Sequence, residues 1–247
     1  MTRSHPARPF QVVGARSLAP LVLTCEHAAS RIPVTGQRSP SLRRLLQSHW
    51  ARDGGAWQLA RAVAGRADAT AVGGRWSRLW IDLNRRADDA ELVLPEVDGV
   101  PLPWNRGLSE SALERRITDY HAPYHAAIDH QIVRRVARGI RPLVVAIHSF
   151  TPVYNGKPRP FDVGVLYEHH RGPAQRVARA VRAAGFTVRY NQPYSGAAGM
   201  MYSADRHGSH HGLVCLELEI NDSLVRRPAR FARLESAVVA ALGAVSG

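Results

Sequence analysis

The sequence predicts a single α/β domain, built on a mostly parallel mixed sheet with helices on both faces. Apolar segments of strand length alternate along the chain with amphipathic segments of helical period. Residues 20–25 form an apolar run typical of a strand buried on both faces, and residues 143–148 and 213–219 repeat the pattern, ending in His and Glu. The 247 residues contain no internal repeat or interdomain linker, and a chain of this length can bury its own core.

The first half of the chain predicts a helical stretch over residues 41–64, interrupted at Asp53, Gly54 and Gly55. Residues 69–72 and 79–83 have the composition of strands, with two glycines between them. Residues 87–108 contain proline and aspartate without a clear period, which indicates a long loop.

The second half predicts a long amphipathic helix over residues 109–139, capped by Ser109 or Ser111 and kinked or split at Pro123. Strands are expected at 143–148, 162–167, 186–190 and 213–219, and helices at 173–185 and 228–242. Residues 191–212 are rich in Gly, Ser, Tyr and His, and we expect an active-site loop there.

The net charge of +13, from 33 Lys and Arg against 20 Asp and Glu, raises the question of nucleic-acid binding. Nearly all of this charge is arginine scattered over helical segments, for example Arg43, Arg116 and Arg135, without a basic tail or a recognition-helix signature. We therefore expect a solvated arginine-rich surface and no nucleic-acid partner. The positive field would also assist the capture of an anionic small substrate.

No segment indicates secretion or membrane insertion. The first ten residues lack the apolar core of a signal peptide, and no apolar run approaches 18 residues. Cys25 and Cys215 both lie in strand patterns, as expected of buried reduced thiols. The sequence therefore predicts a cytoplasmic protein without membrane contact, and it leaves the oligomeric state open.

Three strand ends carry residues suited to a hydrolytic metal site. His27 and His148 each follow a buried strand, and Glu219 ends a third, at the sheet edge where α/β proteins bind ligands. A catalytic zinc takes three protein ligands of this kind and leaves one position for water. The third ligand is Asp53 or Glu26. Because side chains alternate along a strand, Glu26 should point away from His27, which favours Asp53.

Two further pairs of residues have roles in this hypothesis. Glu219 suits the general base that takes a proton from the attacking water and passes it to the leaving amine, with Glu217 on the same strand face as its rival. Asn84 and Arg85 follow a predicted strand, and the arginine fork suits a substrate carboxylate.

The remaining histidines give weaker signals. His121 and His125 have i,i+4 spacing, but Pro123 lies between them and no His-Glu-x-x-His pattern is present, so we expect them to be solvated. His207, His210 and His211 lie in the predicted loop and could bind metal, substrate or nothing.

At these residues the sequence resembles the N-formylglutamate amidohydrolase family. The matching segments follow the family order over roughly residues 18–240, and the ordered set is more specific than any one segment. They are residues 24–27 (TCEH), 53–56 (DGGA), 81–85 (IDLNR), 120–125 (YHAPYH), 146–150 (AIHSF), 162–166 (DVGVL), 191–196 (NQPYSG) and 219–222 (EIND).

This resemblance implies a phosphorylase/hydrolase-like fold related to the zinc carboxypeptidases and aspartoacylases. It implies zinc as the cofactor, His148 as a ligand and Glu219 as the base. The carboxypeptidase pattern has a glutamate three residues after its first histidine, where this chain has Ser30, so the third ligand stays open between Asp53 and Glu26.

The resemblance also implies substrate contacts. Asn84 and Arg85 would hold a substrate carboxylate, and Tyr194 would contact the substrate. Arg75 or Arg78 would polarise the scissile carbonyl.

We therefore expect an N-terminal extension at residues 1–17 and a catalytic domain at residues 18–247. The domain would be a zinc-dependent amidohydrolase acting on a small N-acyl amino acid. N-formyl-L-glutamate, cleaved to formate and L-glutamate within histidine degradation, is the named substrate. The alternatives are another N-acylamino acid, a peptide cleaved by a carboxypeptidase-like enzyme, or a non-enzymatic protein that binds anions or nucleic acid.

Overall fold

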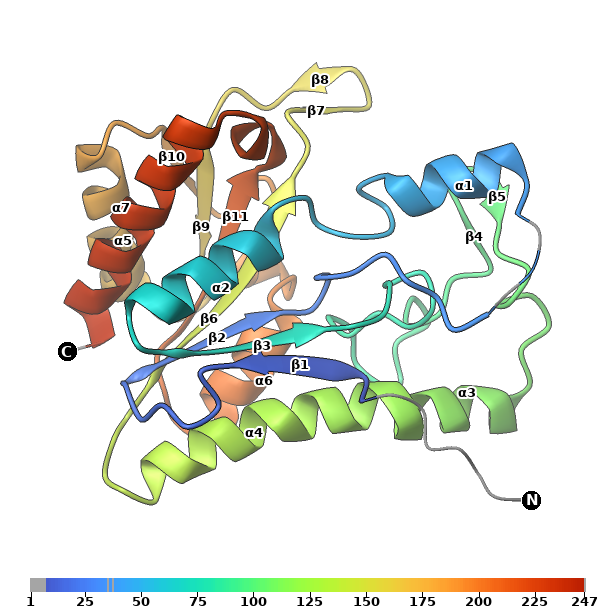
Figure 1. Cartoon of the computed structure of the whole chain (residues 1–247), viewed down its shortest axis with the longest axis horizontal. Coiled ribbons are helices and arrows are strands. Elements are labelled where there is room, and N and C mark those ends of the chain that lie inside the picture. The colour runs from blue at the N-terminus through green and yellow to red at the C-terminus, as the bar shows by residue number, and fades with distance from the viewer. Residues whose placement is uncertain (1–7, 35, 37, 247) are drawn as a thin grey trace.

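The computed structural model describes residues 8–34, 36 and 38–246, and its centre is a seven-stranded mixed sheet (Figure 1). The strand order is β1-β3-β2-β6-β11-β9-β10. The strands are β1 (Phe10–Val13), β2 (Leu21–Cys25), β3 (Thr70–Gly74), β6 (Leu143–Phe150), β9 (Val163–Leu166), β10 (Val188–Tyr190) and β11 (Cys215–Asn221).

The four central strands, β3, β2, β6 and β11, are parallel, as their apolar segments predict. Every residue of β2 is buried, because helices cover both faces of this part of the sheet. The carboxyl ends of these strands therefore meet at one edge. Strands β1 and β9 run antiparallel to β3 and β11, which makes the sheet mixed.

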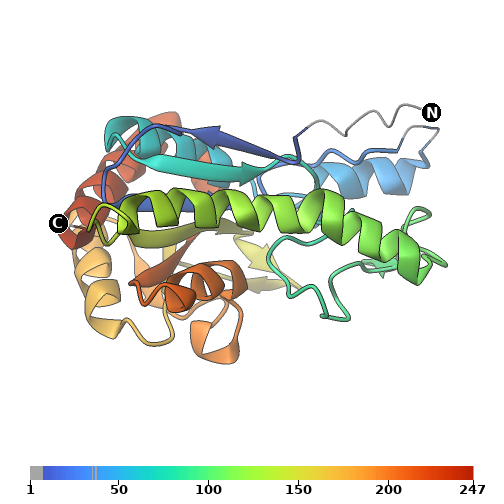
Figure 2. The ribbon, with the colours of Figure 1, turned by 90° about the horizontal axis from the view of Figure 1, so that it is seen from below.

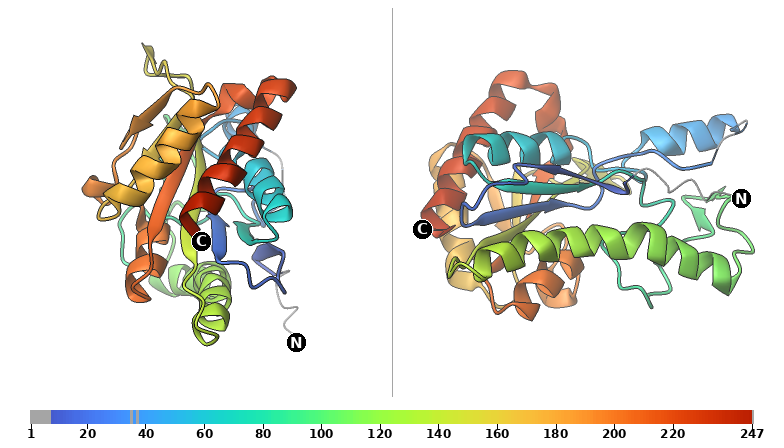
Figure 3. Two further views of the ribbon diagram at one scale, coloured as in Figure 1. Left: turned by 90° about the vertical axis from the view of Figure 1, so that its left-hand side faces the viewer. Right: turned by 60° about the horizontal axis from the view of Figure 1, so that its bottom comes forward.

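Two helical layers enclose the sheet (Figures 2 and 3). Helices α2 (Ala56–Arg66), α5 (Arg171–Ala183) and α7 (Pro228–Ser246) pack on one face through the larger apolar core. Helices α4 (Ala122–Val136) and α6 (Tyr202–His210) cover the other face, with Tyr124, Ile128 and Ile132 of α4 buried.

A smaller apolar cluster lies beyond the ends to which β2 and β3 point (Figure 1). It contains helix α1 (Pro40–Gln47), residues of the hairpin β4 (Glu96–Val97) and β5 (Val100–Pro101), and Leu79 and Leu102. A second hairpin, β7 (Val153–Tyr154) with β8 (Lys157–Pro158), follows β6. Helix α1 and the two hairpins thus lie beyond the carboxyl edge of the sheet.

The predicted helix over residues 109–139 is present and divided near Pro123. Ser109 caps α3 (Glu110–Arg116) by accepting a hydrogen bond from the Ala112 amide, and Pro123 lies in the first turn of α4. A π-helical turn, Ile117–His121, joins the two helices. Such turns shift the helix face by one residue and are common at functional sites.

Two expectations about secondary structure were wrong. Residues 79–83 form no strand: Leu79, Ile81 and Leu83 alternate inward, but their backbone groups bond to loops, for example Asp82 N–H to the Leu92 carbonyl. Residues 191–212 are not all loop, since a short 3-10 turn (Gly196–Ala198) and helix α6 occupy much of the segment.

Not all arginines are solvated, contrary to expectation. Arg116 and Arg135 are buried, because each guanidinium satisfies several backbone carbonyls or polar side chains. Cys25 and Cys215 are buried free thiols, as expected.

Part of the predicted N-terminal extension belongs to the sheet. Residues 1–7 of the predicted extension lie outside the described residues, whereas Phe10–Val13 pairs with β3 as the edge strand β1. Among the described residues, no helix has the length and apolarity needed to cross a membrane.

We predict that Arg135→Met lowers the free energy of unfolding by about 2–4 kcal/mol. The Arg135 guanidinium donates to the Ala19 and Gln131 carbonyls and to Thr70 Oγ1 at 2.7–2.8 Å, so its loss leaves buried acceptors without partners. Urea unfolding measures the effect, with the exposed Arg138→Met as control. Equal stability of the two variants would contradict this role of Arg135.

Candidate metal centre

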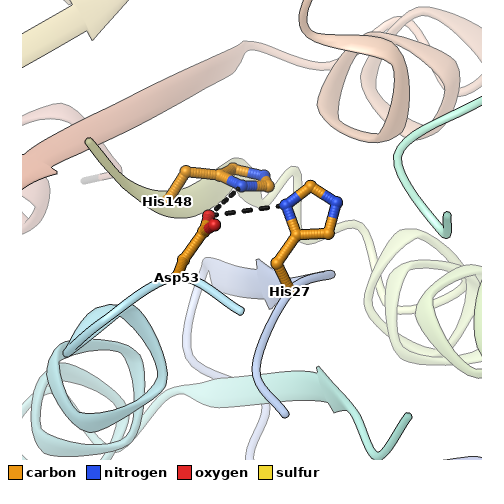
Figure 4. A group of neighbouring side chains, drawn as sticks. All are labelled: His27, Asp53 and His148. Atoms are coloured by element: carbon orange, nitrogen blue, oxygen red, sulfur yellow. Dashed lines mark hydrogen bonds and ion pairs between the residues drawn. The ribbon is translucent and has the colours of Figure 1, made fainter. Parts of the chain in front are cut away.

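The structure brings His27, Asp53 and His148 together at the carboxyl edge of the sheet (Figure 4). Asp53 Oδ2 lies 2.8 Å from His148 Nδ1 and 3.4 Å from His27 Nδ1. One potential ligand atom from each residue lies within 4.8 Å of the others, and all three residues are buried. His27 follows β2, whereas His148 lies within β6, which runs two residues further than expected.

The segment that carries Asp53 is fixed by backbone contacts. The Asp53 amide donates to the His27 carbonyl at 3.0 Å, which ties two candidate ligands to each other. Gly55 is the N-cap of α2 with φ of +78°, and a Cβ there would lie 2.0 Å from Val225 Cγ2. Only glycine satisfies both conditions, which explains the break in the helical pattern at this point.

A carboxylate also lies at the other nitrogen of each imidazole. Asp82 Oδ1 lies 2.7 Å from His27 Nε2, and Glu26 Oε2 lies 2.9 Å from His148 Nε2. In metal sites such partners fix the tautomer and ring orientation, and here they leave both Nδ1 atoms directed towards Asp53. Asp53 therefore has the position of a third ligand, and Glu26 lies beside the other nitrogen of His148.

The Glu26 carboxylate approaches the site despite the expectation that it points away. Its second oxygen accepts a hydrogen bond of 2.8 Å from the Tyr124 hydroxyl on α4. Burial disfavours its charge, but His148 and Tyr124 outweigh burial and lower the pKa of Glu26 to about 2. Glu26 is thus held as an anion beside His148.

Burial and neighbouring charges also have opposite effects on the pKa values of Asp53 and His148. Burial disfavours ionisation of Asp53, but the imidazoles of His27 and His148 hold its pKa well below the usual range. For His148, burial is outweighed by Glu217, Asp53 and Glu26, which raise its pKa well above the usual range. The carboxylates around the two imidazoles therefore form a site that stabilises positive charge.

Both candidate bases line the site from β11. Glu219 lies opposite His148 in the parallel register, and Glu217 Oε2 lies 3.8 Å from His148 Nε2. Burial raises the pKa of Glu217 to about 7 and that of Glu219 well above its usual range. Each keeps one buried oxygen without a hydrogen-bond partner among the described residues.

A cavity of about 310 Å³ opens over these groups. Its lining combines the ionisable centre with apolar and aromatic walls. The lining residues are His27, Trp50, Asp53, Arg78, Leu79, Asp82, Asn84, Arg85, Glu91, Leu94, Val97, His148, Ser149, Tyr154, Tyr194, Met200, Glu217 and Glu219.

Of the two arginines considered for the carbonyl, only Arg78 reaches the cavity. Its guanidinium lies 3.6 Å from Asp53 Oδ1 and 3.4 Å from Asp82 Oδ2. Arg75 is exposed and outside the lining, because it follows β3 in a turn and points to solvent.

Asn84 and Arg85 both line the cavity, and neighbouring helices fix them. The Ser203 amide of α6 donates to Asn84 Oδ1 at 3.0 Å, which leaves the Asn84 NH₂ group as the free donor. Arg85 pairs with Glu91 at 2.7 Å, and its carbonyl lies 2.9 Å from His121 Nε2.

The expectation that His121 and His125 are solvated was wrong. Both are buried, because the π-helical turn and α4 direct them under the loop of residues 82–85. His125 Nδ1 lies 2.9 Å from His207 Nε2, and His207 Nδ1 lies 2.6 Å from Asp129 Oδ1. These histidines join α4 to α6 and do not belong to the three-residue centre.

Sequence reasoning gave no role to several residues of the site. Asp82, which holds both His27 and Arg78, belongs to the segment IDLNR and could have been found from its position two residues before Asn84. Tyr124 belongs to the matching segment of residues 120–125 and could have been found there, whereas Trp50 and Tyr154 gave no signal, since the fold alone brings them to the cavity.

The donor set fits a zinc ion. Two imidazole nitrogens and one carboxylate oxygen are the ligands of a catalytic zinc with an open position. Among the described residues, His27 Nδ1 and His148 Nε2 are buried without a hydrogen-bond partner, whereas His148 Nδ1 faces Asp53 Oδ2 at 2.8 Å.

Comparisons with known proteins identify the family of the chain. The N-formylglutamate amidohydrolase family model matches residues 19–226. A search of curated proteins finds no match.

Two solved structures share the fold over nearly their whole length. Gene product Atu2144 from Agrobacterium tumefaciens is 29% identical with a TM-score of 0.89, and the alignment covers 99% of this chain and 97% of that one. An N-formylglutamate amidohydrolase from Ralstonia eutropha JMP134 is 23% identical with a TM-score of 0.74, and 97% of each chain is covered. The chain therefore belongs to the N-formylglutamate amidohydrolase family and is a hydrolase that acts on amide bonds.

Proposed function

We propose that the protein is a zinc-dependent amidohydrolase that cleaves N-formyl-L-glutamate to formate and L-glutamate. The observation that carries this proposal is the position of Asp53 between two imidazole Nδ1 atoms, on the floor of a cavity that also holds Glu219 and Arg85. The family name supports the substrate.

His27 Nδ1, His148 Nδ1 and Asp53 would hold the zinc ion. A zinc ion bound there supplies Lewis-acid polarisation and lowers the pKa of water. Asp82 and Glu26 keep the two rings in the orientation that this binding requires.

Glu219 is the general base and later the acid. Glu219 lies opposite His148 and lines the cavity, where it would take a proton from the attacking water and return it to the leaving amine. Arg78 faces the cavity with donors to spare, because its contacts with Asp53 and Asp82 are longer than 3.3 Å. It would stabilise the negative charge that develops on the scissile carbonyl oxygen.

Arg85 and Asn84 would orient the substrate. The Asn84 NH₂ group and the Arg85 guanidinium form a donor pair suited to the α-carboxylate. In this structure Arg85 is paired with the exposed Glu91, so the substrate carboxylate would take the place of Glu91.

We predict about one zinc ion per chain in the wild-type protein and its loss in His148→Ala and His27→Ala, because each variant removes one of three protein ligands. Elemental mass spectrometry of purified, zinc-reloaded protein measures this. His130→Ala, which removes an exposed histidine on α4, is the matched control and should retain zinc. Absence of zinc from the wild type, or full retention in both ligand variants, would overturn the proposed centre.

We predict that Glu219→Gln lowers kcat/KM for N-formyl-L-glutamate by about 10³-fold while zinc content is kept, because the amide cannot carry the proton. Glu217→Gln should cause a clearly smaller loss. The opposite ranking of the two variants would assign the base to Glu217. Cleavage of other N-acylamino acids or peptides, without cleavage of N-formyl-L-glutamate, would contradict the proposed substrate. It would still be consistent with a zinc-dependent hydrolase.

A further inference from the structure

The cavity offers too few cations for the substrate proposed above. N-formyl-L-glutamate has two carboxylates, whereas the described lining contains two arginines, Arg78 and Arg85. Arg78 faces Asp53 and Asp82 beside the scissile bond, and Arg85 is needed for one carboxylate. The second carboxylate therefore requires a further donor close to the cavity.

Arg159 occupies a suitable place directly after β8. Its Cζ atom lies 4.6 Å from the centroid of the Tyr154 ring and 5.5 Å from that of Tyr194, and both rings line the cavity. The Phe150 ring, at 5.9 Å, supports it from the sheet. Arg159 is half-buried, so the aromatic rings fix a charged group directly behind two residues of the cavity lining.

The guanidinium of Arg159 keeps donors available. Among the described residues no carboxylate lies within ion-pair distance of it, unlike Arg85, which pairs with Glu91, and Arg230, which pairs with Asp162. A guanidinium beside aromatic rings can still present an N–H edge, and such an edge matches a carboxylate.

Tyr194 lines the cavity beside Arg159. Burial raises the pKa of Tyr194, Glu219 raises it further, and Arg159 and Arg78 oppose this rise. The hydroxyl is therefore within electrostatic reach of both arginines and of the proposed base.

We propose that Arg159, together with the Tyr194 hydroxyl, binds the side-chain carboxylate of the substrate and makes the site selective for acidic N-acyl amino acids. This inference rests on the proposed function and adds a specificity-determining residue to it. Arg85 and Asn84 then hold the α-carboxylate, while the apolar wall around Leu94 and Val97 can pack against the methylene groups between the two ends.

N-formyl-L-glutamate and its uncharged isostere N-formyl-L-glutamine test this proposal. The wild type should favour the glutamate compound, and Arg159→Met should lower kcat/KM for it by about 10- to 100-fold, the effect of one charge-assisted hydrogen-bonded pair. The value for the glutamine compound should stay within about threefold, because the amide gains little from a cation. Arg159→Lys should restore part of the preference.

Arg182→Met is the matched control. Arg182 also lies over a tyrosine ring, 4.8 Å from the centroid of Tyr190, but Tyr190 does not line the cavity, unlike the tyrosines beside Arg159. Its loss should leave the ratio of the two kcat/KM values unchanged.

Calorimetric binding of L-glutamate and L-glutamine separates this inference from the proposed function, since it needs no turnover. If the wild type binds L-glutamate more tightly than L-glutamine and Arg159→Met loses this preference, the inference is supported. Absence of hydrolysis of both formyl compounds would overturn the proposed function but would leave this binding result valid. Equal binding of the two amino acids, or a preference that survives Arg159→Met, overturns the inference.

Discussion

The site depends on the pairing of two buried imidazole rings with carboxylates on both of their nitrogens. His27 lies between Asp53 and Asp82, and His148 lies between Asp53 and Glu26. Buried charges are stable only when opposite charges or hydrogen bonds compensate them. The fold must therefore bring all five of these side chains together. Asp53 is shared by both rings, which makes its position the constraint that the surrounding loops satisfy.

Helix α4 connects this constraint to the rest of the fold. Tyr124 bonds to Glu26 behind His148, while His121 bonds to the backbone of Arg85 on the substrate side. The chain His125, His207 and Asp129 then joins α4 to α6, whose first turn orients Asn84. One buried helix face thus contacts both the metal centre and the carboxylate-binding residues, and the π-helical turn before α4 brings His121 to the required place.

Local patterns were sufficient where a residue's environment follows from its own segment. The apolar runs before His27 and His148 identified buried parallel strands, and the carboxyl edge of such strands is where they meet. The breaks at Gly55 and Pro123 were also visible, because both residues restrict the backbone.

The failures share one cause, which is contact with a distant segment. Apolar and polar residues alternate over residues 79–83 as in a strand, yet among the described residues no neighbouring strand pairs with them through backbone hydrogen bonds. Arg135 and His125 look like surface residues of a polar helix, and only the acceptors supplied by other segments allow their burial. The same limit applied to Arg75 and Arg78, since spacing along the chain does not show which of two arginines faces a cavity.

The central claim is that both imidazoles present Nδ1 to one metal ion, with Asp53 as the third ligand. Anomalous diffraction at the zinc edge from crystals of the zinc-loaded protein tests it most directly. We expect a single peak about 2 Å from His27 Nδ1, from His148 Nδ1 and from an Asp53 oxygen. A peak bound to Glu26, to an Nε2 atom, or to none of these three residues would contradict the account.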